Sequence, residues 1–379
     1  MKLARRLSAK LVLLAGALVF SFGLAELLLR WLTPAALPDT RAMYVWSSPV
    51  MRYWPDGSVR MGLAANLRMA AIAHGKAVYD DMHCVNRQGF LDCIDYADFT
   101  APVRVAFAGD SVMAGQGAPP WFPGLREQSK TLPDVALFNL GVPGAGVQQY
   151  VDLARRTRKE FGWTHVVLPV FCDNFHRRPW VPVERDRLLW FCPQQDFDPL
   201  RGCSGTEQPV GALAASNAGL PELISAAGRL RAALDQRSAP GRPIAPAPGF
   251  KGAARQLIAY SAVLQALNRV RSGVHQRELQ RDLELDNIRA ARDLSAELGD
   301  GRIELWWWSP DTELPGAEPA CRTLKDSLRV EPYFRDIASS CGLNLTDVHA
   351  ADPHVNPAGY RKLTNCFSTA LNNMLRAKP

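Results

Sequence analysis

Short apolar runs alternate with amphipathic stretches from residue 103 onward. Buried strands are predicted at Val103–Ala108, Val135–Leu140, Val166–Phe171 and Ile303–Trp308, with a short fifth strand at Leu343–Thr346. Apolar residues at helical spacing predict helices at Gly146–Glu160 and Pro357–Leu375, and one long helix or two at Ala253–Leu298. Strands separated by helices indicate a parallel sheet covered by helices on both faces, with any chemistry at the carboxyl ends of the strands.

Two regions do not follow this alternation. Residues 33–100, which are rich in Pro, Trp and Met, are expected to form an irregular lead-in to an α/β domain at 101–379. Residues 176–250 are rich in Pro, Gly and Arg, and we interpret them as an insertion near the end of the third strand that could act as a lid.

The N-terminus carries the pattern of a membrane anchor. Residues 11–32 are almost continuously apolar, which is the length of a transmembrane helix, and they follow a basic segment, residues 1–10. Positive charge favours the cytoplasmic side, so the bulk of the chain is expected on the periplasmic side of an inner membrane. The alternative is a signal peptide cleaved after Gly23-Leu24-Ala25. We favour the uncleaved anchor because the apolar run continues beyond that site.

Composition and charge exclude other classes. The 379 residues are 47% hydrophobic and 21% charged, which is typical of a globular chain rather than a disordered one. The net charge of +7 is concentrated at the N-terminus: residues 33–379 hold 39 basic and 36 acidic residues, or +3. This mild excess does not indicate a nucleic-acid partner.

The eight cysteines fit an exported chain, because an even number can pair fully in an oxidising compartment. Cys84 and Cys93 are the first pair expected, from their proximity in sequence. The alternative is that some or all cysteines are buried and reduced. No CxxC and no zinc-like spacing is present, so neither a metal nor a cofactor is expected.

Four polar segments follow the predicted strands. They are Gly109-Asp110-Ser111, Asn139 to Gly146, Asp173-Asn174 and Asp352-Pro353-His354. A serine directly after a buried strand exposes its hydroxyl at the catalytic edge, and glycines leave backbone N–H groups open to a ligand. Histidine is the usual general base near neutral pH, and a neighbouring carboxylate fixes its tautomer. Each segment alone is also common as a plain turn.

In this order, the four segments resemble the SGNH (GDSL-type) hydrolase family. The resemblance covers about residues 85–375 without the insertion, and Val85–Phe90 resembles a segment of membrane-anchored bacterial members. It implies a three-layer α/β/α sandwich with a flavodoxin-like parallel sheet. It also implies site roles: Ser111 as nucleophile, His354 as base and Asp352 as the group that orients His354, with an oxyanion hole made by the backbone N–H groups of Ser111 and Gly144 and the side chain of Asn174.

Three features depart from the family pattern. Asp352 lies two residues before the histidine rather than three, which resembles the subgroup that modifies O-acetyl groups of polysaccharides, and Asp347 with His349 is a rival pair. We prefer Asp352 and His354 because Asn356 and Gly359 follow as in the family. The usual Asn-Asp order is inverted at Asp173-Asn174, and a carboxylate at Asp173 would repel an oxyanion. Gly141 and Gly146 are alternatives to Gly144.

The resulting hypothesis is a periplasm-facing serine esterase or O-acyltransferase that acts on acyl esters of a glycan, with acetyl the expected acyl group. Trp306–Trp308 could stack on sugar rings or pack under helices, and Trp121 and Trp180 are weaker candidates for stacking. One alternative is a lipid esterase or lysophospholipase. The other is a non-catalytic protein that binds or assembles glycans on a degenerate scaffold.

Overall fold

The computed structural model describes residues 42–62, 66–132, 134–238, 262–299, 302–310 and 319–376, together with Ser21 and Leu24. Contacts divide the chain into two units. The two sheets and the site described below belong to the unit that comprises Thr40–Ala233 and Gln280–Pro379, whereas α5 (Leu220–Ser238) and α7 (Ala262–Leu298) have residues in both units. The other unit, Met1–Asp39 with Leu234–Leu279, is described only in part.

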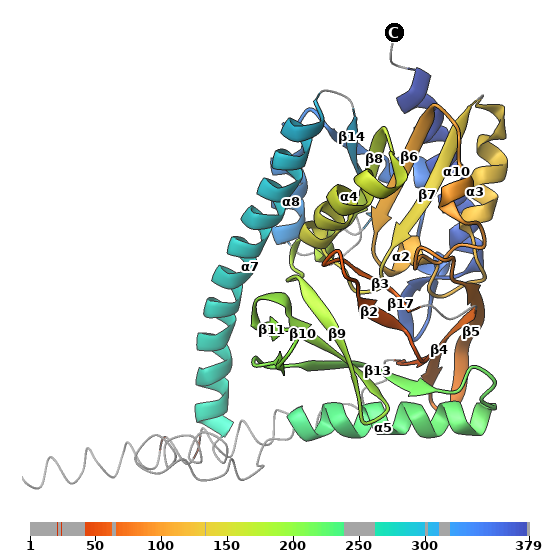
Figure 1. Ribbon diagram of the computed structural model, residues 1–379. Helices are drawn as coiled ribbons and strands as arrows, with labels where there is room; N and C mark the ends of the chain where they lie inside the picture. Colours follow the sequence, from red (N-terminus) through yellow and green to blue (C-terminus); the bar gives the residue numbers. More distant parts are fainter. Residues whose placement is uncertain are drawn as a thin grey trace, which may run out of the picture. The chain divides into compact units, whose positions relative to one another are not determined.

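A five-stranded sheet forms the centre of the α/β part (Figure 1). All its neighbouring strands are parallel, in the order β15-β14-β8-β6-β7. In chain order this is 2-1-3-4-5, the flavodoxin-like arrangement. Its strands are β6 (Val103–Gly109), β7 (Val135–Gly141), β8 (His165–Val170), β14 (Ile303–Trp307) and β15 (Phe334–Asp336).

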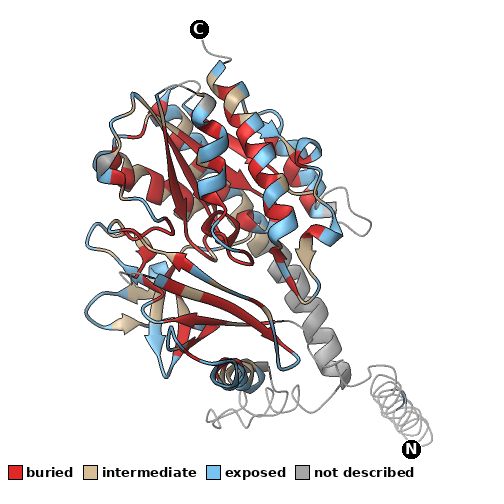
Figure 2. Ribbon diagram, turned by 90° about the vertical axis from the view of Figure 1, so that its right-hand side faces the viewer, coloured by how far each residue is buried: buried red, intermediate tan, exposed pale blue. Residues whose placement is uncertain are grey.

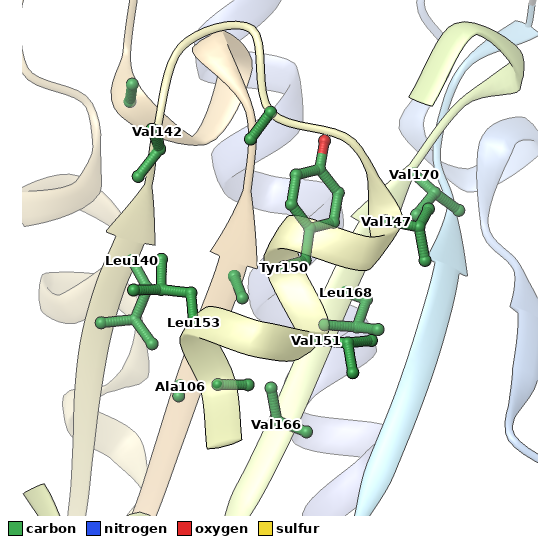
Figure 3. Packing of buried hydrophobic residues seen from close by; sticks show 14 of the residues in the cluster. Ala106, Leu140, Val142, Val147, Tyr150, Val151, Leu153, Val166, Leu168 and Val170 are labelled. Carbon is green, nitrogen blue, oxygen red and sulfur yellow. The ribbon is translucent and has the colours of Figure 1, made fainter. Parts of the chain in front are cut away.

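Successive strand residues face opposite sides of this sheet, so the sheet has two apolar faces. On one face, Ala106 and Leu168 pack in a cluster with α4 (Val147–Phe161) and α8 (Pro319–Leu328). Figure 3 shows this side, where apolar residues of α4 such as Val151 and Leu153 face the strands. On the other face, Phe107 and Trp306 pack against α3 (Phe122–Gln128) and α10 (Pro357–Arg376). The arrangement is therefore helix layer, sheet and helix layer.

A second, six-stranded sheet has the order β5-β4-β1-β13-β10-β9. Only β1 and β13 pair in parallel; the other pairs are antiparallel. Its strands are β1 (Met43–Ser47), β4 (Asn66–Ala73), β5 (Lys76–Cys84), β9 (Trp180–Arg185), β10 (Leu188–Pro193) and β13 (Gln208–Ala214). Figure 2 shows that strands of both sheets are largely buried.

Apart from the 3-10 helices, the remaining described elements are short except for α5 and α7. They are α2 (Ser111–Ala114), α5 (Leu220–Ser238), α7 (Ala262–Leu298), α9 (Ala338–Cys341), β2 (Met51–Tyr53), β3 (Val59–Met61), β11 (Phe197–Asp198), β12 (Gly202–Cys203), β16 (Val348–His349) and β17 (Asp352–Val355).

The second sheet corrects the expectation of an irregular lead-in. Residues 33–100 are not irregular, because they contain β1 to β5. Residues 176–250, which follow β8 of the parallel sheet, contain β9 to β13 and all of α5. The two regions join through the parallel pairing of Val45 with Ala212. The β4–β5 hairpin turns through His74-Gly75 and the β9–β10 hairpin through Asp186-Arg187, and all four of these residues have positive φ. Such turns favour Asn-Gly or Asp-Gly, and neither sequence matches that signal.

The fifth strand was also predicted at the wrong place. Residues Leu345–Asp347 form a 3-10 helix, and the edge strand of the parallel sheet is β15. The other four strands and the helices at α4 and α10 are confirmed within two residues at each end. The long helix predicted at Ala253–Leu298 is described from residue 262.

All eight cysteines lie in described residues and form four disulfides. The pairs are Cys84–Cys93, Cys172–Cys321, Cys192–Cys203 and Cys341–Cys366. The expected Cys84–Cys93 pairing is therefore confirmed. The anchor predicted at 11–32 lies outside the described residues except for Ser21 and Leu24. In the part of the chain that is described, no helix has the length and apolar character to cross a membrane.

Candidate active site

Ser111 follows the end of β6 and lies in the wall of a cavity. β6 stops at Gly109, and Ser111 is the first residue of the short helix α2. The carboxylate of Asp110 accepts a hydrogen bond from the backbone N–H of Val112 at 3.0 Å, which caps this helix and fixes the turn. Ser111 is mostly buried, with 7% of its surface exposed, and that exposed part lines the cavity.

His354 lies beside Ser111 and links it to Asp352. The Nε2 atom of His354 is 2.9 Å from Ser111 Oγ, and its Nδ1 atom is 2.8 Å from Asp352 Oδ1. Asp352 and His354 both belong to β17, where alternate side chains point to the same face. An Asp two residues before the His therefore reaches the imidazole because the segment is extended. The three side chains form a continuous chain of hydrogen-bonding groups.

The carboxylate of Asp352 is fully buried and has a further partner. The hydroxyl of Tyr44, from β1, donates a hydrogen bond to Asp352 Oδ1 at 2.9 Å. Burial by itself would raise the pKa of Asp352, but the hydrogen bonds from His354 and Tyr44 and the charge of His354 outweigh it. The pKa of Asp352 is therefore lowered, and the group is a carboxylate at neutral pH.

The rival pair has other partners. His349 Nε2 is 2.6 Å from the carbonyl oxygen of Gly117. Asp347 accepts hydrogen bonds from the Lys362 ammonium at 2.7 Å and the Asn344 backbone N–H at 2.9 Å. The geometry therefore favours Asp352 and His354 as the partners of Ser111.

Of the three candidate glycines, only Gly144 lines the cavity. Gly144 has a φ of +81°, and a Cβ atom there would lie 2.6 Å from the ring of Phe191. Gly141 donates its N–H to Asn139 Oδ1 at 3.0 Å and packs against the backbone of α2. Gly146 packs against Arg177 and caps α4. Of these three glycines, Gly144 is thus the one whose backbone borders the cavity.

Asn174 is adjacent to the site but does not reach the cavity. It has no exposed surface, and its Nδ2 donates a hydrogen bond to Asp110 Oδ2 at 3.0 Å. Its Oδ1 accepts a hydrogen bond from the Phe171 backbone N–H at 2.9 Å. In this geometry Asn174 holds Asp110, the residue before the serine, instead of facing a substrate carbonyl.

The inverted Asp173 is balanced by a neighbouring arginine that the sequence did not single out. Arg177 donates from Nε to Asp173 Oδ2 at 2.7 Å and from Nη1 to Asp110 Oδ2 at 2.8 Å. Burial would lower the pKa of Arg177, but the charges of the two carboxylates raise it above its ordinary value. Asp173 lines the cavity, and its negative charge is paired with the Arg177 guanidinium.

The cavity has a volume of about 950 Å³ and a strongly aromatic lining. Its walls come from the carboxyl edge of the parallel sheet and from the second sheet. Apolar lining residues include Trp46, Phe171, Trp180, Phe191, Val210, Trp308 and Leu343. Polar lining residues include His176, Arg178, Gln208 and Asn344.

The candidate tryptophans separate into two groups. Trp180 and Trp308 line the cavity, as residues that could contact a substrate would. Trp306 and Trp307 have no exposed surface and pack in the cores on opposite faces of the sheet. Trp121 is also buried, with its ring centroid 5.5 Å from that of Tyr360. Within the ranges described, no group of three side chains has the chemistry and proximity to hold a metal ion.

Comparisons with known proteins give only distant similarities. No family model and no curated protein matches the chain. A putative acylhydrolase from Bacteroides fragilis is 14% identical over 74% of this chain and 93% of its own, with a TM-score of 0.33. A lipase/acylhydrolase from Enterococcus faecalis is 12% identical over 72% of this chain and 96% of its own, at 0.32. A GDSL-like lipase from Bacteroides thetaiotaomicron is 12% identical over 73% and 94%, at 0.33. Similarity at this level assigns neither a family nor an activity to the chain.

Proposed function

We propose that this protein is a serine-dependent esterase or acyltransferase with Ser111, His354 and Asp352 as its catalytic triad. The observation that carries the proposal is the aligned chain of contacts: 2.9 Å from Ser111 Oγ to His354 Nε2 and 2.8 Å from His354 Nδ1 to Asp352. Ser111, at one end of this series of contacts, lies in the wall of a cavity large enough for a substrate. A nucleophile, a base and a group that orients the base are the three parts that covalent acyl transfer needs.

The reaction follows from these positions. His354 Nε2 accepts the proton of the Ser111 hydroxyl while Ser111 Oγ forms a bond to the ester carbonyl carbon. The carbonyl oxygen becomes an oxyanion, which the backbone N–H groups of Ser111 and Gly144 stabilise. When the intermediate collapses, the C–O bond to the leaving alcohol breaks and His354 returns the proton to that oxygen. Water, or the hydroxyl of an acceptor, then attacks the acyl-enzyme by the same steps in reverse order and frees Ser111.

We further propose that the substrate is an O-acylated glycan outside the cytoplasmic membrane. The apolar segment at 11–32 and the four disulfides both support an exported location, since disulfides persist in oxidising compartments. Trp180 and Trp308 in the cavity wall support a sugar ligand, because aromatic faces pack against sugar rings. Hydrolysis and transfer differ only in whether water or a second hydroxyl reaches the acyl-enzyme.

The lining of the cavity favours a second candidate, an ester with a bulky apolar acyl group such as a lipid. Trp46, Phe191 and Val210 provide apolar surface well beyond what an acetyl group covers. A series of p-nitrophenyl esters from acetyl to decanoyl separates the two. A kcat/KM that rises with chain length favours the lipid ester, whereas one that is highest for acetyl favours the acetylated glycan.

The test of the triad is covalent labelling of the full chain with a fluorophosphonate, with the modified residue identified by mass spectrometry. We expect an adduct on Ser111, its absence in Ser111→Ala, and strongly reduced labelling in His354→Ala. Ser204→Ala is the matched control, because Ser204 is an exposed serine whose hydroxyl donates a hydrogen bond to the backbone carbonyl oxygen of Asp196. If Ser111 of a folded wild-type protein stays unlabelled, the enzyme proposal fails and the glycan-binding alternative replaces it.

A further inference from the structure

We propose that Tyr44, on the first strand of the second sheet, is a positioning residue of the triad: its hydroxyl holds the Asp352 carboxylate in the orientation that His354 requires. The inference rests on the proposed function. It gives the second sheet a role in orienting the triad, although none of the sequence segments that carry the triad belongs to that sheet.

The contacts place the Tyr44 hydroxyl and the His354 imidazole on one oxygen. Asp352 Oδ1 accepts from the Tyr44 hydroxyl at 2.9 Å and lies 2.8 Å from His354 Nδ1. The side chain of Asp352 has no exposed surface, so protein donors must replace water around its charge. The Tyr44 ring also meets the His354 ring edge-on, with centroids 5.4 Å apart and an interplanar angle of 78°. Tyr44 therefore contacts both members of the acid–base pair.

The backbone around Tyr44 is well fixed. β1 is an interior strand with β4 on one side and β13 on the other, and Tyr44 pairs with Ala71 of β4. The Tyr44 ring is parallel to that of Trp46, with an interplanar angle of 3°. The N–H of Ala42 donates to the carbonyl oxygen of Ala351 at 3.0 Å, which ties the start of β1 to the residue before Asp352. The backbone is thus fixed on both sides of the contact between Tyr44 and Asp352.

A second tyrosine of the same sheet reinforces this arrangement. Tyr79, on β5, accepts a hydrogen bond from Gln116 Nε2 at 2.8 Å. Burial, followed by the nearby charge of Asp352, raises the pKa of Tyr79 well above its ordinary value, so its hydroxyl keeps its proton. Tyr79 also packs within 6.4 Å of the His354 ring centroid. Tyr79 therefore stays neutral near Asp352, and His354 is the charged partner that lowers the pKa of this carboxylate.

This arrangement has a defined effect on the acid–base pair. A hydrogen bond from Tyr44 draws charge from the carboxylate and leaves its orientation toward Nδ1 fixed. Without that bond, the Asp352 carboxylate would keep more negative charge and would stabilise the protonated imidazole more strongly. It would also rotate more freely away from Nδ1. Among the described residues, His354 and Tyr44 outweigh burial and lower the pKa of Asp352, and burial together with the charge of Asp352 raises the pKa values of Tyr79 and Tyr360. Two further carboxylates, Asp81 and Asp110, also act on Tyr360.

The experiment is Tyr44→Phe in the full chain, which removes the hydroxyl and retains the ring. We expect kcat for a p-nitrophenyl ester to fall about tenfold with KM within about twofold of wild type, the size of one lost hydrogen bond to a charged group. The acid limb of the kcat/KM profile should move to higher pH. The downfield proton resonance of His354 Nδ1–H should change position. Tyr53→Phe is the control, since Tyr53 is 38% exposed on β2 and does not line the cavity.

Several outcomes would overturn the inference. An unchanged kcat, or a lower kcat with the wild-type pH profile and an unmoved imidazole resonance, means that Tyr44 serves only stability. The resonance is measured without turnover, so it tests the Tyr44–Asp352–His354 contact even if no ester is cleaved. Failure of the proposed function shows instead as absence of turnover and of Ser111 labelling in the wild type.

Discussion

The indole N–H of Trp180 donates a hydrogen bond to the carbonyl oxygen of Gly144 at 2.9 Å. Trp180 begins β9 in the second sheet, and Gly144 lies in the loop between β7 and α4 of the parallel sheet. The Trp180 ring stacks on Phe191 of β10, with centroids 3.4 Å apart and an interplanar angle of 8°. The second sheet therefore supports the loop that carries a proposed oxyanion donor as well as the carboxylate of the triad.

Replacing Trp180 by Phe should impair turnover more than it lowers stability. The variant keeps an aromatic ring beside Phe191 but loses the bond to Gly144, so the loop is less firmly oriented. We expect kcat to fall about tenfold, less than the loss of roughly 10²–10³ that follows removal of an oxyanion donor itself. Steady-state kinetics with a fixed ester give the value. Trp190→Phe is matched, because the Trp190 indole also donates to a backbone carbonyl, that of Arg185, away from the cavity. Equal effects of both variants would contradict the prediction.

Gly144→Ala should impair catalysis far more than Gly202→Ala. Both glycines have a φ close to +80°, +81° and +82°, so both substitutions carry a similar backbone cost of about 1–2 kcal/mol. A methyl group at Gly144 would also lie 2.6 Å from the Phe191 ring, whereas no described neighbour lies within 4 Å at Gly202. We expect turnover to fall by about two orders of magnitude for Gly144→Ala and to stay near the wild-type rate for Gly202→Ala. Similar activities at matched thermal stability would argue against Gly144 as an oxyanion donor.

The parallel sheet could be predicted from sequence because four of its strands, β6, β7, β8 and β14, are short apolar runs. β15 escaped this pattern, since Phe334–Asp336 has one buried residue and two exposed polar ones. The second sheet escaped it for a different reason. Its two halves meet through the pairing of Val45 with Ala212, and no local pattern reports a contact over that separation.

The same distinction applies to the candidate site. Ser111, Asp352 and His354 each follow or occupy a strand of the α/β part, so motif and spacing were enough to single them out. The short Asp-x-His spacing, which looked like a departure, is the spacing that an extended strand requires. Tyr44 and Arg177 could not be found in this way. Tyr44 reaches the site only through the pairing of β1, and Arg177 only because Asp110 and Asp173 converge on it.

The disulfides should differ in their contributions to stability according to the length of chain that each closes. Cys172 and Cys321 are 149 residues apart, and Cys192 and Cys203 are 11 apart. The loop-entropy relation gives a difference of about 2 kcal/mol in favour of the longer loop. We expect the double Ala variant of the first pair to lose that much more unfolding free energy in urea than the double Ala variant of the second. Equal losses would mean that native-state packing, and not the unfolded chain, decides these values.

His83 should make the protein less stable in mild acid. It lies in β5 with 2% of its surface exposed, its Nε2 has no hydrogen-bond partner among the described residues, and burial lowers its pKa to about 4 from 6.5. Between these two pKa values His83 is protonated in the unfolded chain but neutral in the folded chain. The contribution of neutral His83 to the unfolding free energy is therefore complete above pH 6.5 and is lost as the pH falls toward 4. The loss amounts to about 3 kcal/mol. Urea unfolding at about pH 7 and about pH 4.5 should therefore show a smaller fall in unfolding free energy for His83→Phe than for wild type, while the exposed His74→Asn should follow wild type. Parallel pH curves for wild type and His83→Phe would show that other groups govern acid stability.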